Sequence, residues 1–208
     1  MAIYLDEAMM GRDPSVVGFP HILLCMSFVL RTAGGLWGVH LETPETSGAL
    51  MDAFLDWAAG HGLADFTAVT DVYACCNHIV RYGAAGGNHW ETEVRRFTTH
   101  MVWHGPVHGF DTSVIAPHDG TYIEFRHSLV GQPCKIFYDV NEGIQVGPSV
   151  AVYLAGGIVA KYHYAQRRLQ TGAYMKSTVT KVAPFGAPGL AGAFPELNYA
   201  LRLTTFAV

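Results

Sequence analysis

The sequence predicts an α+β domain: a largely antiparallel, multi-stranded sheet system with two main helices packed on one side of it. Three observations lead to this class. Short apolar runs rich in β-branched and aromatic residues recur along the chain, Gly- and Pro-rich turns separate these runs, and two longer segments have the 3.6-residue period of amphipathic helices. Their order, a strand pair, a helix, a strand, a helix and then many strands, is typical of layered α+β domains.

A hairpin and a helix are the first predicted elements. Residues 1–18 indicate a polar lead-in. Apolar runs at 22–30 and 36–41 flank the turn Thr32-Ala33-Gly34-Gly35, and a Gly-containing turn between two such runs predicts paired antiparallel strands. The helix 47–61 follows, with apolar residues at helical spacing and Thr46 or Ser47 available as its N-cap.

The remaining elements are strands and one further helix. Partial alternation and β-branched residues predict a strand over 66–73 that continues through Cys75-Cys76 to Val80. Helical periodicity returns at 90–103 and ends at Gly105-Pro106. Turn signals such as Asp119-Gly120 then separate a series of strands. These are predicted at 107–115, 121–129, 134–140, 150–154, 158–164, 176–182 and 200–208, with a loop at 185–194.

The length of the chain is compatible with one large domain or two small ones, and we expect a single domain covering residues 1–208 because no clear linker or low-complexity segment divides it. Half of the 208 residues are hydrophobic and only 14% are charged, which is enough apolar material for a core. The formal net charge is -4, and no basic cluster exceeds the pairs Arg95-Arg96 and Arg167-Arg168, so we expect no nucleic-acid surface. No stretch approaches the roughly 20 apolar residues that a membrane-spanning helix needs, so we expect no membrane span. The oligomeric state is not indicated.

The cysteines and the N-terminus bear on the cellular compartment. The four cysteines, Cys25, Cys75, Cys76 and Cys134, do not have the spacing of a disulfide framework, and we expect reduced, mostly buried thiols. Residues 1–7 lack the basic flank and apolar core of a secretory signal. These features indicate a protein made in the cytoplasm, and export by a route that needs no cleaved signal peptide stays open.

Cys25 and His40 are the leading candidates for a catalytic pair. They lie fifteen positions apart on the two arms of the predicted hairpin, so a short turn brings them close together on one face of the sheet. A thiol becomes a good nucleophile when a neighbouring base takes its proton, and an imidazole supplies such a base. The alternative is that Cys25 is a small core residue and His40 a partly buried, hydrogen-bonded histidine.

The residues around this pair resemble the chemoreceptor glutamine deamidase family. The resemblance rests on Cys25, the glycine pair of the turn, Gly38-Val39-His40, Pro44 and the amphipathic helix that follows. The segment is similar also to the catalytic domains of the cytotoxic necrotizing factor and Burkholderia lethal-factor toxins, which share that active-site arrangement. As a pattern of elements, the similarity extends over about residues 16–142 and leaves a sheet-rich extension at about 143–208.

This resemblance implies a cysteine-dependent glutamine deamidase that acts on a protein partner, as a bacterial effector or signalling protein. Cys25 would be the nucleophile and His40 the base, and the reaction needs no cofactor. Two positions depart from the family pattern. Leu23-Leu24 precede the cysteine where the family has Gly-Ser, and the family's upstream threonine corresponds to a position near Phe19. In the family the Gly-Ser pair lets the backbone form the oxyanion pocket, so the two leucines leave open whether this pocket forms beside Cys25.

Histidines supply a second candidate chemistry. His100, His104 and His108 recur at four-residue intervals, and two imidazoles at i and i+4 share one face of a helix, where they suit a metal. This pattern predicts a metal-dependent hydrolase with one open coordination position. Because Gly105-Pro106 interrupts the helix before His108, a polar helix end with histidines favoured by the helix dipole is the alternative.

Two further alternatives stay open. Adjacent residues of a strand point to opposite faces, so we expect one of Cys75 and Cys76 in the core and the other at the surface, with Cys76 near His78 as a reserve nucleophile. The sequence is also compatible with a non-catalytic binding or assembly protein, in which many strands and a low charge density build an interaction surface.

Overall fold

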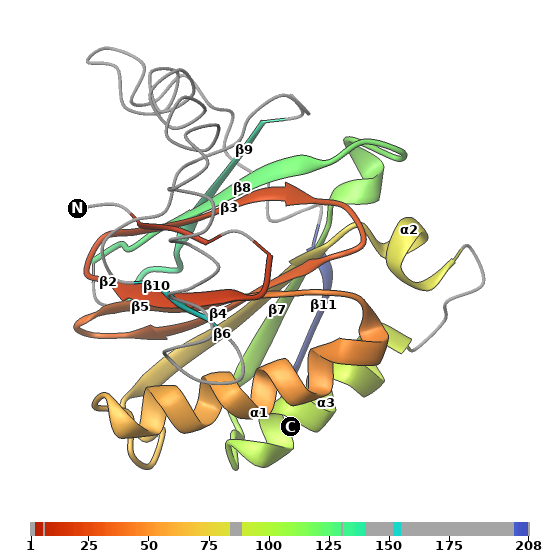
Figure 1. Ribbon diagram of the computed structural model, residues 1–208. Coiled ribbons are helices and arrows are strands. Elements are labelled where there is room, and N and C mark those ends of the chain that lie inside the picture. Colours follow the sequence, from red (N-terminus) through yellow and green to blue (C-terminus); the bar gives the residue numbers. More distant parts are fainter. Residues whose placement is uncertain are drawn as a thin grey trace, which may run out of the picture.

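Two sheets and a helical layer are stacked in the structure, a computed structural model that describes residues 3–5, 7–83, 89–129, 131–139, 152–154 and 202–207 (Figure 1). Helices α1 (Pro44–Gly60) and α3 (His89–His100) cover one face of a seven-stranded sheet, and a four-stranded sheet covers its other face. Most neighbouring strands are antiparallel. The predicted α+β class, with two main helices on one side, is confirmed.

The large sheet is built around the hairpin of β4 and β5. Its strand order is β10-β2-β5-β4-β6-β7-β11, and β6 and β7 are a parallel pair within it. A parallel pair needs a long crossover, and here α2 and α3 lie between the two strands along the chain. The predicted continuation of β6 to Val80 was wrong, because Asn77 caps a helix that starts directly after the strand. The strand bounds are β2 Met9–Asp13, β4 Met26–Thr32, β5 Gly35–Leu41, β6 Val69–Cys76, β7 Pro106–Asp111, β10 Val152–Leu154 and β11 Arg202–Ala207.

The small sheet has the order β1-β3-β8-β9. β1 runs parallel to β3, and the other two pairs are antiparallel. Its strands are β1 Ile3–Tyr4, β3 Val16–Ile22, β8 Thr121–Arg126 and β9 Lys135–Asp139, and two short helical turns, α2 His78–Tyr82 and η1 Thr112–Val114, complete the described elements.

Both faces of the central strands are buried. Met26, Phe28 and Leu30 of β4 face the helices, whereas Val29 faces the small sheet. Every residue of β4 and β5 is buried. A strand covered on both sides has no polar face, and this is why the sequence shows these two strands as nearly continuous apolar runs.

Two glycines of the hairpin are required by the fold. A Cβ atom at Gly38 would lie 2.8 Å from side-chain carbons of both Val17 and Phe19, which is closer than two carbon atoms pack. Gly35, in the turn, has a φ of +138°, a conformation that L side chains rarely adopt. Gly35 thus allows the turn, and Gly38 allows the small sheet to approach β5 closely, two residues before His40.

Residues 1–18 are not the predicted polar lead-in. Their described part includes β1, β2 and the start of β3, and β2 pairs with β5 in the large sheet. Met9 of β2 packs between the sheets, and Met10 packs toward the helices. β2 has only five residues and includes Gly, Arg and Asp, so it lacks the apolar run that marks the other strands.

The strand predicted at 22–30 is divided between the two sheets. Ile22 ends β3 in the small sheet, and Met26 starts β4 in the large sheet. Cys25 therefore lies in the connection between the sheets, directly before β4. A single apolar run conceals this change of sheet, because burial in either sheet selects the same residue types.

The first helix begins earlier than predicted. α1 starts at Pro44 with Thr43 as its N-cap residue, and the backbone N–H groups of Thr46 and Ser47 both donate to the Thr43 carbonyl. Proline suits the first helical position because its missing N–H has no partner there in any helix. The predicted cap at Thr46 or Ser47 was therefore wrong by one turn.

The C-terminal third contributes edge strands. β10 pairs with β2 at one edge of the large sheet, and β11 pairs with β7 at the other edge. The predicted elements at 158–164, 176–182 and 185–194 lie outside the described residues. The single domain, with its sheet-rich extension from about residue 143, stays a prediction.

Candidate functional site

The β4–β5 hairpin places Cys25 and His40 on the same face of the large sheet. Ser27 pairs directly with His40 across the hairpin, and Cys25 precedes Ser27 by two residues, so the three side chains share a face. This face is covered by the small sheet. Cys25 belongs to the apolar layer between the sheets, and the His40 ring meets the Phe19 ring edge-on, with centroids 5.9 Å apart.

The connection between β1 and β2 covers both side chains. Cys25 Sγ donates a hydrogen bond to Glu7 Oε1 at 2.7 Å, and His40 Nδ1 lies 2.8 Å from the Leu5 carbonyl oxygen. The Ala8 N–H donates to the backbone carbonyl of His40. Cys25 is 3% exposed and His40 is 1% exposed. The candidate pair is therefore closed to solvent in this structure.

The surroundings of Cys25 keep its thiol protonated. Burial raises the pKa of the Cys25 thiol far above its ordinary value, and the hydrogen bond to Glu7 and the charges of Glu7 and Glu42 raise it further. The Arg81 guanidinium opposes them and lowers this pKa. At neutral pH the sulfur is a neutral thiol, which is the less reactive form.

The hydrogen bond to Leu5 fixes the tautomer of His40. A carbonyl oxygen only accepts hydrogen bonds, so the nearby Nδ1 carries the proton. In the neutral ring, Nε2 is then the unprotonated nitrogen. His40 thus presents Nε2 as its basic atom, as a general base requires.

Arg81 joins the backbone on either side of the candidate pair. Its Nη1 donates to the Leu24 carbonyl at 2.5 Å and to the Glu42 carbonyl at 2.6 Å. Leu24 directly precedes Cys25, and Glu42 follows His40 by two residues. Leu24 is 45% exposed, whereas Cys25 beside it is buried. The sequence gives no signal for Arg81, which is only 6% exposed although it is charged.

A network from three helices holds Arg81 in place. Arg81 Nη2 lies 2.6 Å from Glu93 Oε1, and Arg81 Nε donates to Glu93 Oε2 at 3.1 Å. Tyr82 and Ser47 also donate hydroxyl hydrogen bonds to the Glu93 carboxylate. Because Ser47, Arg81 and Glu93 come from α1, α2 and α3, the network fixes the guanidinium from several sides.

The predicted metal site is not formed. His100, at the end of α3, contacts Asp52 of α1 in the helical layer at 3.1 Å, whereas His108 of β7 stacks on Tyr73 between the two sheets. The helix ends before His108, and the side-chain alternation of β7 turns this residue to the opposite face. Within the described parts of the chain, no group of three His, Cys, Asp or Glu residues is placed to hold a metal ion.

Cys75 and Cys76 point to opposite faces, as predicted. Cys75 packs between the sheets and Cys76 packs toward the helices, and both are 0% exposed. The prediction that one of them lies at the surface was wrong, because both faces of this strand are covered. Burial raises the pKa of the Cys76 thiol. The reserve nucleophile is therefore sealed more completely than Cys25.

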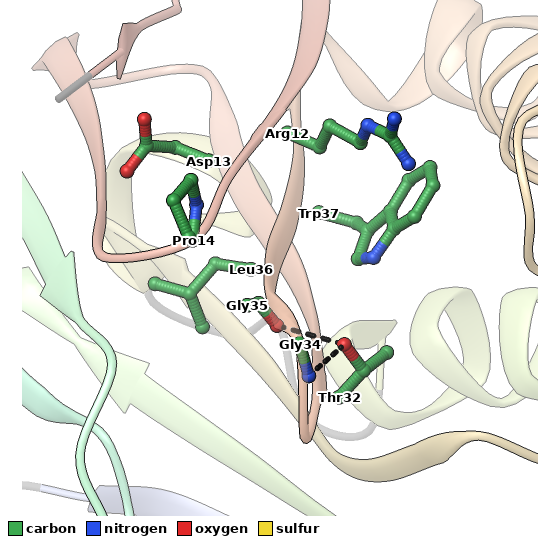
Figure 2. A pocket seen from close by; sticks show the side chains of 8 residues that line it. All are labelled: Arg12, Asp13, Pro14, Thr32, Gly34, Gly35, Leu36 and Trp37. Atoms are coloured by element: carbon green, nitrogen blue, oxygen red, sulfur yellow. Dashed lines mark hydrogen bonds between the residues drawn. The ribbon is translucent and has the colours of Figure 1, made fainter. Parts of the chain in front are cut away.

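Two cavities lie at the opposite end of the hairpin from Cys25. One, of about 400 Å³, lies beside the β4–β5 turn, where the Arg12 guanidinium stacks over the Trp37 ring at 4.9 Å (Figure 2). It is lined by Arg12, Asp13, Pro14, Thr32, Gly34, Gly35, Leu36 and Trp37. Neither cavity is lined by Cys25 or His40.

The second cavity, of about 570 Å³, is lined by Arg31, Asp71 and His108 among others. Arg31 Nη1 lies 2.7 Å from Asp71 Oδ2, and His108 Nε2 lies 3.7 Å from Asp71 Oδ1. His108, Arg31 and Thr70 together hold the pKa of the Asp71 carboxyl low, at about 2. The sequence gives no signal for this cluster, because Arg31, Asp71 and His108 come from three different strands.

Comparison with protein-family models and with curated proteins gave no match for this chain. The resemblance to glutamine deamidases therefore rests on the residues of the hairpin and on the order of the elements. Among the described residues, no helix is both long and apolar enough to cross a bilayer.

Proposed function

We propose that the chain is a cysteine-dependent glutamine deamidase that acts on a protein partner, with Cys25 as nucleophile and His40 as base. The observation that carries this proposal is the register of the β4–β5 hairpin, which puts the thiol and the imidazole on one face, close to the end of the same two strands. The tautomer of His40 supports it, because the hydrogen bond to Leu5 leaves Nε2 as the basic nitrogen of the ring.

The reaction has two stages. His40 accepts the thiol proton, and the sulfur adds to the carboxamide carbon of a glutamine side chain. The C–N bond then breaks, and ammonia leaves with a proton returned by His40. Water attacks the resulting thioester, the C–S bond breaks, and the products are glutamate and the free thiol. The bacterial effector or signalling role stays part of the proposal that follows from the resemblance.

The reaction requires an opening of the cover over the pair. A substrate carboxamide reaches Cys25 only after Glu7 has left the sulfur, since the closed site leaves 3% of the residue exposed. Loss of the Glu7 contact also removes two of the interactions that raise the pKa of the thiol. Opening therefore admits the substrate and activates the nucleophile in one step.

Ammonia release tests the proposal directly. The probes are casein, as a glutamine-containing protein, and an end-blocked glutaminyl-glycine dipeptide, with glutamate formation checked by mass spectrometry. We expect Cys25→Ala to abolish ammonia release and Cys76→Ala to retain it, because the two cysteines are similar in burial but only Cys25 shares a face with His40. Equal activity of Cys25→Ala and the parent protein would contradict the proposal.

A second candidate is a non-catalytic binding or assembly protein. The observation that favours it is the sealed, protonated Cys25 thiol, which is the state of a structural core cysteine. The two candidate functions predict different reactivities of Cys25 in the folded protein. A structural Cys25 reacts with iodoacetamide only when the protein unfolds, whereas a nucleophile under a movable cover reacts in the folded protein.

A further inference from the structure

Two buried arginines bind their surroundings in the same way at opposite ends of β4. Arg31 pairs with Asp71 and donates to the carbonyls of Ser128 and Leu129. Arg81 pairs with Glu93 and donates to two carbonyls, of Leu24 and Glu42. Only Arg81 contacts the peptide next to Cys25.

The contact between Arg81 and the Leu24 carbonyl also affects the Cys25 N–H, because both groups belong to one trans peptide unit. The Leu24 carbonyl belongs to the same peptide unit as the Cys25 N–H, and the described chain has no cis peptide bond. In a trans unit the C=O and N–H groups point in opposite directions. By holding the Leu24 carbonyl, Arg81 therefore fixes the direction in which the Cys25 N–H points.

We propose that Arg81 is the positioning residue of the Cys25–His40 site, an inference that rests on the proposed deamidase function. It orients the Cys25 N–H, the backbone donor of the nucleophile's own residue, toward the oxyanion that forms on the carboxamide oxygen when the sulfur adds. It also fixes the chain that follows His40, through the Glu42 carbonyl. The Gly-Ser pair that Leu23-Leu24 replace is then not needed for flexibility, because the orientation comes from the guanidinium.

Arg81 also acts on the Cys25 thiol, through its positive charge. The charged groups that act on the thiol are Glu7 from the β1–β2 connection, Glu42 from the end of β5, and Arg81 from α2. Both carboxylates raise the pKa of the thiol, and Arg81 alone among them lowers it. Once Glu7 moves away, Arg81 is the neighbouring charge that stabilises the thiolate.

Three variants separate the orienting role from the charge. Arg81→Lys keeps the positive charge but loses the planar guanidinium, whose Nη1 donates to both carbonyls while Nε and Nη2 bind Glu93. The double variant Arg81→Gln/Glu93→Gln removes the charge and leaves no unpaired buried carboxylate. Arg31→Lys is the matched control, since it changes the equivalent arginine at the far end of β4. Melting temperatures show whether each variant is folded.

The readouts are the rate of Cys25 alkylation by iodoacetamide at pH 9, measured on the Cys25 peptide by mass spectrometry, and ammonia release from casein. We expect the double variant to alkylate about tenfold more slowly, the effect of raising the thiol pKa by about one unit. Arg81→Lys should alkylate at nearly the parent rate but deamidate at least about tenfold more slowly, because a misplacement of about 1 Å costs up to about a hundredfold. Arg31→Lys should change neither rate.

The outcomes distinguish this inference from the proposed function. If the folded double variant alkylates at the parent rate, or if Arg31→Lys slows the reaction as much, Arg81 has no special role. If the double variant does not fold, the split between alkylation and deamidation in Arg81→Lys decides the question. If the parent protein releases no ammonia, the deamidase proposal fails, while the alkylation ratio still measures the effect of Arg81 on Cys25.

Discussion

The two ends of β4 are built alike but differ in access to solvent. At the start of the strand, Glu7 covers Cys25 on the face of the small sheet, and the Arg81–Glu93 pair joins α2 to α3. At its end, the Arg31–Asp71 pair lines a cavity of about 570 Å³. The residues that resemble a catalytic site are thus at the closed end, and the two cavities described above are at the open end. A set of residues that resembles a known catalytic site and a cavity that can hold a ligand are therefore separate kinds of support, and in this molecule they lie at different ends of one strand.

The largest expected effect concerns the open end. Arg31→Ala leaves Asp71 partly buried without its cation and removes the donor to two carbonyls, so we expect a loss of about 3–5 kcal/mol in the free energy of unfolding. Urea unfolding measures it. Arg95→Ala, which breaks an exposed pair with Glu91, is the control and should cost less than about 1 kcal/mol. Equal costs would show that the buried pair does not hold this end together.

The pH dependence of stability sharpens the same comparison. The pKa of Asp71 is about 2 in the folded protein and about 3.8 in its ordinary state, so its carboxylate stabilises the fold above pH 4. The contribution, about 2 kcal/mol, is lost as the pH falls from about 4 toward 2. We expect Asp71→Asn to unfold with a shallower dependence on pH in this range, by urea titration at several pH values. An unchanged dependence would assign the acid sensitivity to other carboxyls.

The closed end is tested by removing the charge of its cover. Glu7→Gln keeps the size of the side chain but removes a charge that raises the pKa of the Cys25 thiol. We expect alkylation of Cys25 at pH 9 to be about tenfold faster, which corresponds to a pKa lower by about one unit. Glu42→Gln is the control, because Glu42 acts on the thiol through its charge alone and should have a smaller effect. No change in Glu7→Gln would mean that Glu7 does not hold the thiol in its neutral form.

The smallest effect is expected at the hairpin turn. Thr32 Oγ1 accepts a hydrogen bond from Gly34 N–H and donates one to the Gly35 carbonyl (Figure 2). Thr32→Ala should cost about 1 kcal/mol of unfolding free energy. It should leave the alkylation rate of Cys25 unchanged, since the turn lies at the opposite end of the strands. A parallel change in Cys25 reactivity would show that the two ends are coupled.

What the sequence predicts correctly depends on local signals. The hairpin is predicted because a Gly-Gly turn and its flanking apolar runs are neighbours in the chain, and the shared face of Cys25 and His40 follows from the register. The partners that decide their reactivity are distant in sequence. Glu7 is 18 residues from Cys25, and Arg81 is 57 residues from Leu24. No periodicity or spacing connects such residues, so their contacts follow only from the packed fold.

The three histidines at four-residue intervals show that a local signal can also predict a site that the fold does not form. His100, His104 and His108 have a regular spacing that is local and easily seen, but the spacing implies one face only while the helix continues. Once the chain changes from α3 to β7, the residue period changes from 3.6 to 2, and His108 turns toward the other sheet. A local pattern is thus informative within one element and misleading across two.

Labelling with an electrophilic glutamine analogue, a diazoketone in place of the carboxamide, tests the central claim most directly. The claim is that Cys25 and His40 act together as a nucleophile and its base. We predict that peptide mass spectrometry of the folded protein locates the label on Cys25, and that His40→Gln slows the labelling at least about tenfold, as expected for the loss of a general base. Labelling of another residue, or equal rates in the parent protein and His40→Gln, would contradict the account.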